Sequence, residues 1–368
     1  MARQPKRSDE PTLERLRLQI DEIDRQIQAL ISERARCAKQ VGEVKGLTDK
    51  ADYYRPEREA QVLRAVTERN EGPLNNEQLL RLFREIMSAC LAQEEPLKVA
   101  YLGPEGTFTQ SAVYTQFGHS VRALSVPTID EVFHEVESGV ADFGVTPVEN
   151  STEGTVNHTL DMFLTSPLKI CGEVELRIHQ HLLGRMKDLT QIKRVCSHSQ
   201  SFAQCRAWLA LYLPNVEKIT VSSNAEAARR ARDEEGTAAL AGNAAAELYD
   251  LDTLYSNVED QGDNTTRFLV IGRDTFPPSG NDKTSLLIST TSTEGPGVLH
   301  HLLEPLAKHN ISMTRIESRP SRRRKWDYVF FVDIDGHAED EGVKQALEQM
   351  SAESDLFRIL GAYPKAVV

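Results

Sequence analysis

The chain has 368 residues, and at roughly 150 residues per domain it should form two or three domains. Its 43 lysines and arginines against 55 aspartates and glutamates give a net charge of −12, which argues against nucleic acid and anionic membranes as main partners. No apolar run approaches the ~18 residues that a membrane span needs, and the first residues hold no apolar signal-peptide segment. The five cysteines are odd in number and scattered, so we expect reduced thiols in a cytoplasmic protein and no metal site.

Residues 12–45 are predicted to form one long helix, because leucines, isoleucines and valines recur at alternating spacings of three and four. Such a helix is about 51 Å long at 1.5 Å per residue, longer than a small domain is wide. A second copy of the helix is therefore the expected partner. Shorter helices are predicted at 56–70 and 76–93, which makes residues 10–95 an all-α, dimerising unit.

Arg34 occupies the apolar seam of the long helix, between Leu30 and Val41. A charge at a core position is costly unless an anion meets it, and Lys45 lies on nearly the same face about three turns later. Spacing alone leaves two interpretations open. One is a solvated coiled-coil face with a register-setting arginine, and the other is a cationic pocket for a small dicarboxylate.

The segments LRLQIDEIDRQIQALISERARCAKQVGEVK, YRPERE and LFREIMSACLA resemble the AroQ-type chorismate mutases over nearly all of residues 12–95. The resemblance implies that three arginines, Arg17, Arg34 and Arg58, bind the chorismate carboxylates. Arg17 would enter the site of the other subunit. Lys45 donates to the ether oxygen and Glu59 binds the ring hydroxyl. The complete set of implied substrate contacts is Arg17, Arg34, Lys45, Arg58, Glu59, Cys90 and Glu94, of which Arg34, Lys45 and Glu94 are the expected catalytic residues.

The chemistry of that reaction suits a unit without histidine. A Claisen rearrangement needs orientation and stabilisation of the charge that builds on the ether oxygen, and it needs no general base. Glu94 is a departure, because the family often has glutamine there and only a protonated carboxyl could donate to that oxygen.

We therefore predict that mutase activity falls as pH rises. The substitution Glu94→Gln should flatten the pH profile, because an amide donates at any pH. The measurement is the mutase rate against pH for both proteins. An unchanged profile in the variant would contradict the role of Glu94.

After residue 96 the pattern changes to strands alternating with helices. Helices are predicted at 108–117 and 129–138 and strands at 97–103 and 142–148. A second alternating series follows at 173–258, with a single helix at 201–212, and then a strand at 264–272. Such alternation implies parallel sheets, and two series imply two α/β lobes with a cleft between them. The predicted domain covers residues 97–274, with the second lobe at about 175–260.

Four motifs are expected beside that cleft, at 103–108 (GPEGTF), 147–154 (PVENSTEG), 197–205 (SHSQSFAQC) and 265–268 (TTRF). The glycine loop alone is equally consistent with a plain strand–helix turn or with an anion site. Together the motifs resemble the prephenate dehydratases, whose two lobes are periplasmic-binding-protein-like. The resemblance implies that Thr266 is the main catalytic residue, assisting departure of the ring hydroxyl as carbon dioxide leaves. It also implies a cleft lined by Thr107, Glu149, Asn150, Ser151, Ser197 and Gln204.

His198 has two interpretations, as a general acid or as a residue that packs and holds its loop. The family's usual Ser-His-Pro-Gln stands here as Ser-His-Ser-Gln over 197–200, so the loop lacks the restriction that proline imposes.

Beyond a linker at 275–283, residues 283–362 show the β-α-β-β-α-β order of a small ferredoxin-like α+β domain. An NAD loop at 295–297 is not expected, because His300 replaces the third glycine of that fingerprint. Two motifs resemble those of the ACT domain and imply a feedback site for L-phenylalanine at a subunit interface. Their residues are Gly297, Val298, Leu299, Glu317, Ser318, Arg319 and Pro320. The basic run at 322–325 is interpreted as solvated.

The sequence therefore predicts a multidomain enzyme that converts chorismate to prephenate and then to phenylpyruvate, without metal or organic cofactor. L-phenylalanine is the expected effector and a homodimer the expected assembly, with association beyond the dimer left open. One rival is a non-catalytic two-lobed binding protein, which needs neither Thr266 nor a cationic pocket. The other is a mutase fused to prephenate dehydrogenase, which needs a nucleotide fingerprint that the sequence lacks.

Overall fold

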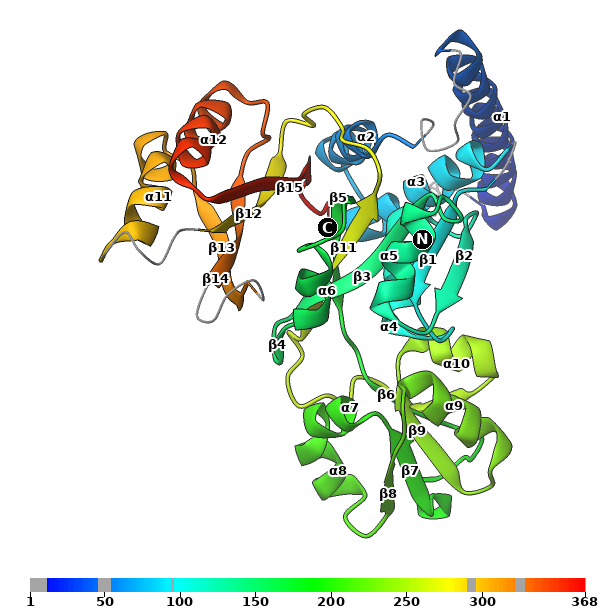
Figure 1. The fold of residues 1–368 in the computed structure, drawn as a ribbon. Coiled ribbons are helices and arrows are strands. Elements are labelled where there is room, and N and C mark those ends of the chain that lie inside the picture. Colours follow the sequence, from blue (N-terminus) through cyan, green and yellow to red (C-terminus); the bar gives the residue numbers. More distant parts are fainter. Residues whose placement is uncertain (1–11, 46–53, 94–95, 290–295, 322–327, 368) are drawn as a thin grey trace, which may run out of the picture.

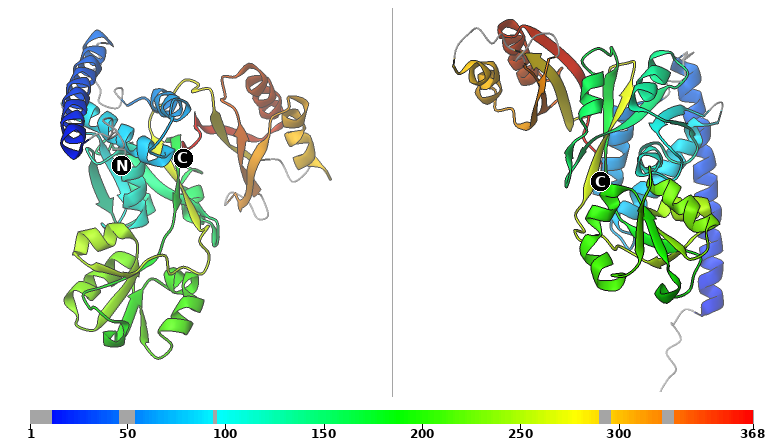
Figure 2. Two further views of the ribbon diagram at one scale, coloured as in Figure 1. Left: turned by 180° about the vertical axis from the view of Figure 1, so that it is seen from behind. Right: turned by 60° about the horizontal axis from the view of Figure 1, so that its bottom comes forward.

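A computed structural model describes residues 12–45, 54–93, 96–289, 296–321 and 328–367. They form an all-α unit, two α/β lobes and an α+β unit, which confirms the predicted fold class (Figure 1). The two lobes lie one beyond the other, and the helical and C-terminal units flank the first lobe on opposite sides (Figures 1 and 2).

The helical unit consists of α1 (Leu13–Lys45), α2 (Pro56–Glu68) and α3 (Asn76–Leu91). Asn75 starts α3 with a capping box. Its side chain accepts a hydrogen bond from the backbone N–H of Gln78, and the Gln78 side chain accepts one from the backbone N–H of Asn75. Helices α2 and α3 share a small apolar core, whereas α1 leaves its apolar side chains in solvent. Seven of them are between 41% and 64% exposed: Leu16, Leu18, Ile20, Ile23, Ile27, Leu30 and Val41.

The sheet of the first lobe has the strand order β2-β1-β3-β11-β5, with β4 paired to β3. Its strands are β1 (Lys98–Leu102), β2 (Arg122–Val126), β3 (Phe143–Asn150), β4 (Gly154–Thr155), β5 (Lys169–Arg177) and β11 (Thr265–Gly272), and its helices are α4 (Phe108–Phe117), α5 (Ile129–Glu137) and α6 (Asn157–Met162). The predicted parallel pairing is found between β1, β2 and β3, but it does not extend across the whole sheet. Strand β11 returns from the second lobe and runs antiparallel to both β3 and β5.

The second lobe has the strand order β10-β6-β9-β7-β8. Its strands are β6 (His181–Gly184), β7 (Arg194–Ser197), β8 (Glu217–Thr220), β9 (Thr237–Ala241) and β10 (Asp252–Tyr255), with a short 3-10 turn at Leu189–Gln191. The helices are α7 (Ser199–Gln204), α8 (Arg206–Tyr212), α9 (Asn224–Asp233) and α10 (Asn243–Tyr249). A single helix was expected where α7 and α8 stand. The helix is interrupted at Cys205. The carboxylate of Asp260 accepts hydrogen bonds from the backbone N–H groups of Ala207 and Trp208, at 2.8 and 3.0 Å, and so caps a new helix.

The C-terminal unit is an antiparallel sheet of order β13-β14-β12-β15. Its elements are β12 (Asp282–Ser289), α11 (Val298–Lys308), β13 (Met313–Pro320), β14 (Tyr328–Asp335), α12 (Glu341–Glu353) and β15 (Leu356–Pro364). The two helices cover one face of the sheet. The other face packs on the first lobe through Leu287, Phe331 and Leu360. Burial of each of these side chains contributes about 1.5–3 kcal/mol to the stability of the folded protein.

The chain returns to the helical unit after β15. Val367 packs against the core of α2 and α3, and its carbonyl accepts a hydrogen bond from Arg84 Nη2 at 2.7 Å. The first lobe is thereby held from both sides, by the helical unit and by the C-terminal unit.

Candidate functional site

A cavity of about 530 Å³ lies where the two lobes meet. The first lobe contributes the turn between β3 and β4 and the segment before β11, and the second lobe contributes α7. The lining residues are Thr152, Glu153, Ser199, Gln200, Ala203, Gln204, Asp260, Gln261 and Asn264. Apart from Gln204 these residues were missed as site residues, although most belong to the motifs at 147–154 and 197–205 or directly precede TTRF.

Thr266 lies at the start of β11, beside this cavity, and its hydroxyl is held by Asn150 at the end of β3. Asn150 Nδ2 donates to Thr266 Oγ1 at 2.8 Å and to Asn264 Oδ1 at 2.9 Å. The Asn150 Oδ1 atom accepts the backbone N–H groups of Thr152 and Glu153, which fixes the orientation of the amide. Because Thr266 Oγ1 accepts from this amide, its own proton stays available for a bound molecule.

Three further predicted cleft residues form hydrogen bonds within the protein. Ser151 Oγ accepts the backbone N–H of Thr265 at 3.0 Å, next to Thr266. Gln204 lines the cavity and accepts from Gln180 Nε2 at 3.2 Å. Thr107 Oγ1 donates to the carbonyl of Pro104 at 2.9 Å, so the glycine loop satisfies its own hydroxyl.

Glu149 and Ser197 differ from the prediction that they line the cleft. The Glu149 carboxylate forms an ion pair with Arg315 of β13 at 3.0 Å, on the side turned to the C-terminal unit. Ser197 is fully buried, and its Oγ lies within hydrogen-bond distance of the Leu240 carbonyl and of Asn224 Oδ1, at 3.0 and 3.1 Å. Neither side chain is among the residues that line the cavity.

The loop-holding interpretation of His198 fits the structure. Its ring Nδ1 accepts the backbone N–H of Gln200 at 3.4 Å and caps α7. Gln200 in turn donates to the carboxylate of Glu153, so the two lobes are joined across the mouth of the cavity.

Among the described residues, the predicted mutase side chains differ in their surroundings. Arg17 is exposed on α1, Arg34 is half-buried, and exposed Arg58 bonds to Gln61 on its own helix. Cys90 is buried in α3. Glu94 and the side chain of Lys45 lie outside the described residues.

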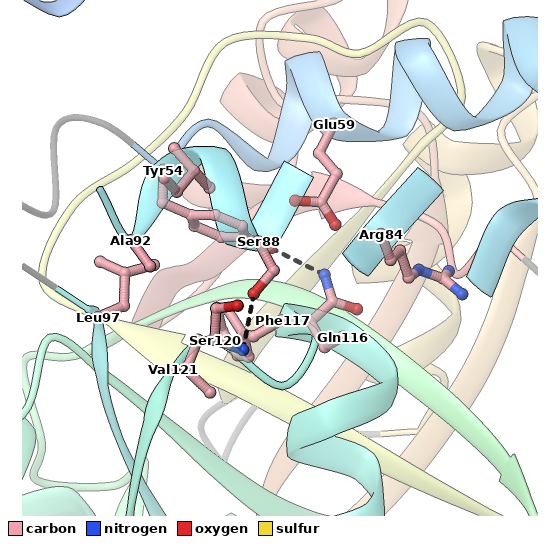
Figure 3. Close-up of a pocket in the computed structure, with 11 residues that line it drawn as sticks. Tyr54, Glu59, Arg84, Ser88, Ala92, Leu97, Gln116, Phe117, Ser120 and Val121 are labelled. Atoms are coloured by element: carbon pink, nitrogen blue, oxygen red, sulfur yellow. Dashed lines mark hydrogen bonds between the residues drawn. The ribbon is translucent and has the colours of Figure 1, made fainter. Parts of the chain in front are cut away.

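Glu59 lies apart from those residues, between α2, α3 and the first lobe (Figure 3). Its carboxyl faces Arg84 and Tyr54, and Tyr54 accepts a hydrogen bond from Gln116 Nε2 at 2.9 Å. Burial raises the pKa of the Glu59 carboxyl to about 7, although the charge of Arg84 opposes the rise. The predicted contact of Glu59 with the substrate's ring hydroxyl stays a prediction.

The raised pKa of Glu59 makes stability depend on pH. The folded protein favours the protonated carboxyl, so the free energy of unfolding should fall as pH rises from about 4.5 to about 7 and then level off. The full shift corresponds to about 3 kcal/mol. We expect Glu59→Gln to raise the thermal midpoint relative to wild type more at pH 8 than at pH 5. The control is Glu68→Gln, an exposed acid on the same helix, and an equal change at both pH values would contradict the burial of the charge.

The two predicted effector motifs lie on different elements of the C-terminal unit, one at the start of α11 and the other on β13. Gly297 precedes α11 with φ of +92°, a left-handed conformation that suits glycine, and Val298 and Leu299 form the first turn. On β13, Glu317 accepts from Thr155 at 3.0 Å and Arg319 pairs with Asp161 at 2.8 Å, both on the first lobe. Ser318 and Pro320 are exposed.

Comparison with known proteins assigns each part of the chain. Residues 16–95 match chorismate mutase type II, residues 99–276 match prephenate dehydratase, and residues 287–352 match the ACT domain. The chain is 54% identical to the bifunctional chorismate mutase/prephenate dehydratase of Pseudomonas aeruginosa, over 98% of this chain and 100% of that protein. The chain belongs to this bifunctional family.

Two further relatives agree with that membership. The bifunctional chorismate mutase/prephenate dehydratase of Neisseria gonorrhoeae is 50% identical over 95% of this chain and 96% of its own length. The crystal structure of Arthrobacter aurescens prephenate dehydratase in complex with L-Phe is 32% identical, with a TM-score of 0.68 over 74% of this chain and 93% of that one. The predicted family, both enzyme domains and the ACT domain are thus confirmed.

Within the described ranges, no helix is long and apolar enough to cross a membrane. The same residues contain no group of three or more histidine, cysteine or acidic side chains arranged to hold a metal ion.

Proposed function

We propose that this chain rearranges chorismate to prephenate in its helical unit and converts prephenate to phenylpyruvate, carbon dioxide and water between its two lobes. The observation that carries the second step is the Asn150–Thr266 hydrogen bond beside the interlobe cavity. Thr266 donates its proton to the departing ring hydroxyl, which leaves as water, while the C–C bond to the ring carboxylate breaks and its electrons complete the aromatic ring. A proton taken up from solvent then restores the Thr266 hydroxyl, so one proton is consumed in each turnover. Removing the leaving group's charge in a site screened from water is what lowers the barrier.

For the first step we propose that the arginines of α1 and α2, with Lys45 and Glu94, complete a pocket when two chains pair along α1. The apolar side chains exposed on α1 support this pairing, because burial against a second copy would remove them from water. Arg17 then reaches the partner's site, and Cys90 contributes from α3. Glu59 completes the set only if its carboxyl turns from Arg84 toward that pocket.

For regulation we propose L-phenylalanine as the effector, bound by the ACT domain near the segments at 297–299 and 317–320. The support is the ACT match together with the Arthrobacter dehydratase solved with L-Phe. We further propose that the enzyme acts in the cytoplasm as a homodimer without a cofactor, which fits its five unpaired thiols.

The test is to supply chorismate alone and to follow prephenate and phenylpyruvate without NAD. We expect both to appear in sequence, and phenylalanine to slow the second. A protein that binds prephenate without consuming it would be the non-catalytic rival. Formation of 4-hydroxyphenylpyruvate that requires NAD would identify the dehydrogenase.

A further inference from the structure

Strand β13 of the ACT domain directs three charged side chains, those of Arg315, Glu317 and Arg319, toward the dehydratase lobe. They stand at alternate positions and are partly buried, whereas the residues between them are exposed. Since successive side chains of a strand point to opposite faces, the ESRP segment is split between two surroundings. Glu317 and Arg319 face the dehydratase together with Arg315, while Ser318 and Pro320 face away.

Arg315 makes the contact that reaches the β3–β4 hairpin. Its Nε lies 3.0 Å from Glu149 Oε2, and its Nη2 donates to Thr155 Oγ1 at 3.2 Å. Thr155 Oγ1 in turn donates a hydrogen bond to Glu317 Oε2 at 3.0 Å. The Arg315 side chain is 11% exposed and that of Glu149 is 39% exposed, so this charge-assisted contact is shielded from water on the side of the arginine.

The two residues that Arg315 contacts are cross-strand partners in the β3–β4 hairpin. The next residue of β3 is Asn150, which holds the Thr266 hydroxyl. The turn of the same hairpin carries Thr152 and Glu153, which line the cavity. One short hairpin therefore has the ACT domain at its base and the proposed catalytic hydroxyl, with a wall of the cavity, at its tip.

We propose that inhibition by phenylalanine reaches the dehydratase site through Arg315. This inference rests on the proposed function, in which phenylalanine binds the ACT domain. An effector changes activity only if it binds two arrangements of the protein with different affinity. The contacts of Arg315 make the β3–β4 hairpin part of that difference, because a shift of β13 displaces Glu149 and Thr155, and with them Asn150. Glu317 and Arg319 then act as interdomain contacts, so their loss would abolish inhibition without their touching the effector.

The experiment uses the full chain with the substitution Arg315→Gln. Dehydratase kcat and KM are measured without effector, phenylalanine binding by calorimetry, and dehydratase rate against phenylalanine concentration. We expect basal activity within about twofold of wild type and retained phenylalanine binding, while the inhibitory concentration rises by at least about tenfold or inhibition is lost. The mutase rate reports whether the variant is folded.

The matched control is Arg358→Gln. Arg358 is also an ACT arginine that crosses to the dehydratase lobe, where it donates to the carbonyls of Phe163, Leu164 and Ser166, away from the hairpin. Inhibition should persist in this variant. If Arg315→Gln does not fold, Thr155→Val decides, since it removes the hydroxyl that joins Arg315 to Glu317 and keeps the shape of the side chain.

Each other result overturns the proposal. Normal inhibition in Arg315→Gln would show that the hairpin contact is not used. Equal loss of inhibition in Arg358→Gln would show that domain docking as a whole carries the effect, and loss of phenylalanine binding would place Arg315 in the effector site. A wild-type protein that binds no phenylalanine would refute the proposed regulation itself, whereas the first three results leave it standing.

Discussion

Replacing Thr266 by alanine should lower dehydratase kcat by about 10³-fold and leave the mutase rate unchanged, so that chorismate is converted only as far as prephenate. The hydroxyl is held at 2.8 Å from the Asn150 amide, an arrangement in which it can give its proton only outward. Without it the departing ring hydroxyl leaves as a strong base. The measurement is the amount of prephenate and phenylpyruvate formed from chorismate over time.

The neighbouring Thr265 supplies the control for this substitution. Its hydroxyl donates to the Asp263 carbonyl at 3.2 Å, so Thr265→Ala removes a hydroxyl from the same strand end without touching Asn150. We expect it to keep activity within a few-fold, and Thr266→Ser to keep a measurable fraction. A Thr266→Ala protein within about tenfold of wild-type kcat would exclude the hydroxyl as the main catalytic group.

Arg34→Ala and Arg17→Ala should each lower mutase kcat/KM by about 10²–10³-fold while dehydratase activity on added prephenate is retained. Each substitution removes a cation that meets a dianionic substrate. The two arginines lie on the same helix but serve different sites if Arg17 acts on the partner subunit. The measurement is the rate of chorismate consumption by each purified variant.

Mixed dimers separate this arrangement from a site built within one chain. When the two variants are co-expressed, half of the dimers are mixed, and each mixed dimer has one site with both arginines intact. About a quarter of the wild-type mutase activity should return. No recovery would mean that Arg17 and Arg34 serve the same site of one chain, and the exposed apolar face of α1 would then need another explanation.

Local patterns were sufficient to predict most elements. The three-four spacing located α1 within a residue of its observed bounds, and the alternation of strands and helices located both lobes. The antiparallel entry of β11 was missed, because the direction in which a returning strand crosses between lobes depends on tertiary contacts. The break at Cys205 was missed for the same reason, since its cause is Asp260, which lies far along the chain.

The candidate site shows a similar division. Motif membership identified Asn150 and Thr266, whose hydrogen bond the structure contains. It could not tell which face of a strand each residue occupies relative to a second domain, so Glu149 was expected in the cleft and is found on Arg315. For Glu59 the deciding feature is burial between α2, α3 and the first lobe, which follows from how the helical unit docks and which no local pattern contains.

The hydrogen bond between Arg84 and the carbonyl of Val367 joins residues 283 positions apart. On a translating ribosome that emits 5–20 residues per second, roughly 15 to 60 seconds separate the synthesis of these two partners. During that interval α2 and α3 have left the exit tunnel with part of their buried surface uncovered. Helices α2 and α3 are made early but are thus among the last parts to be fully enclosed, and their exposure to chaperones is set by the time needed to translate the two lobes and the ACT domain.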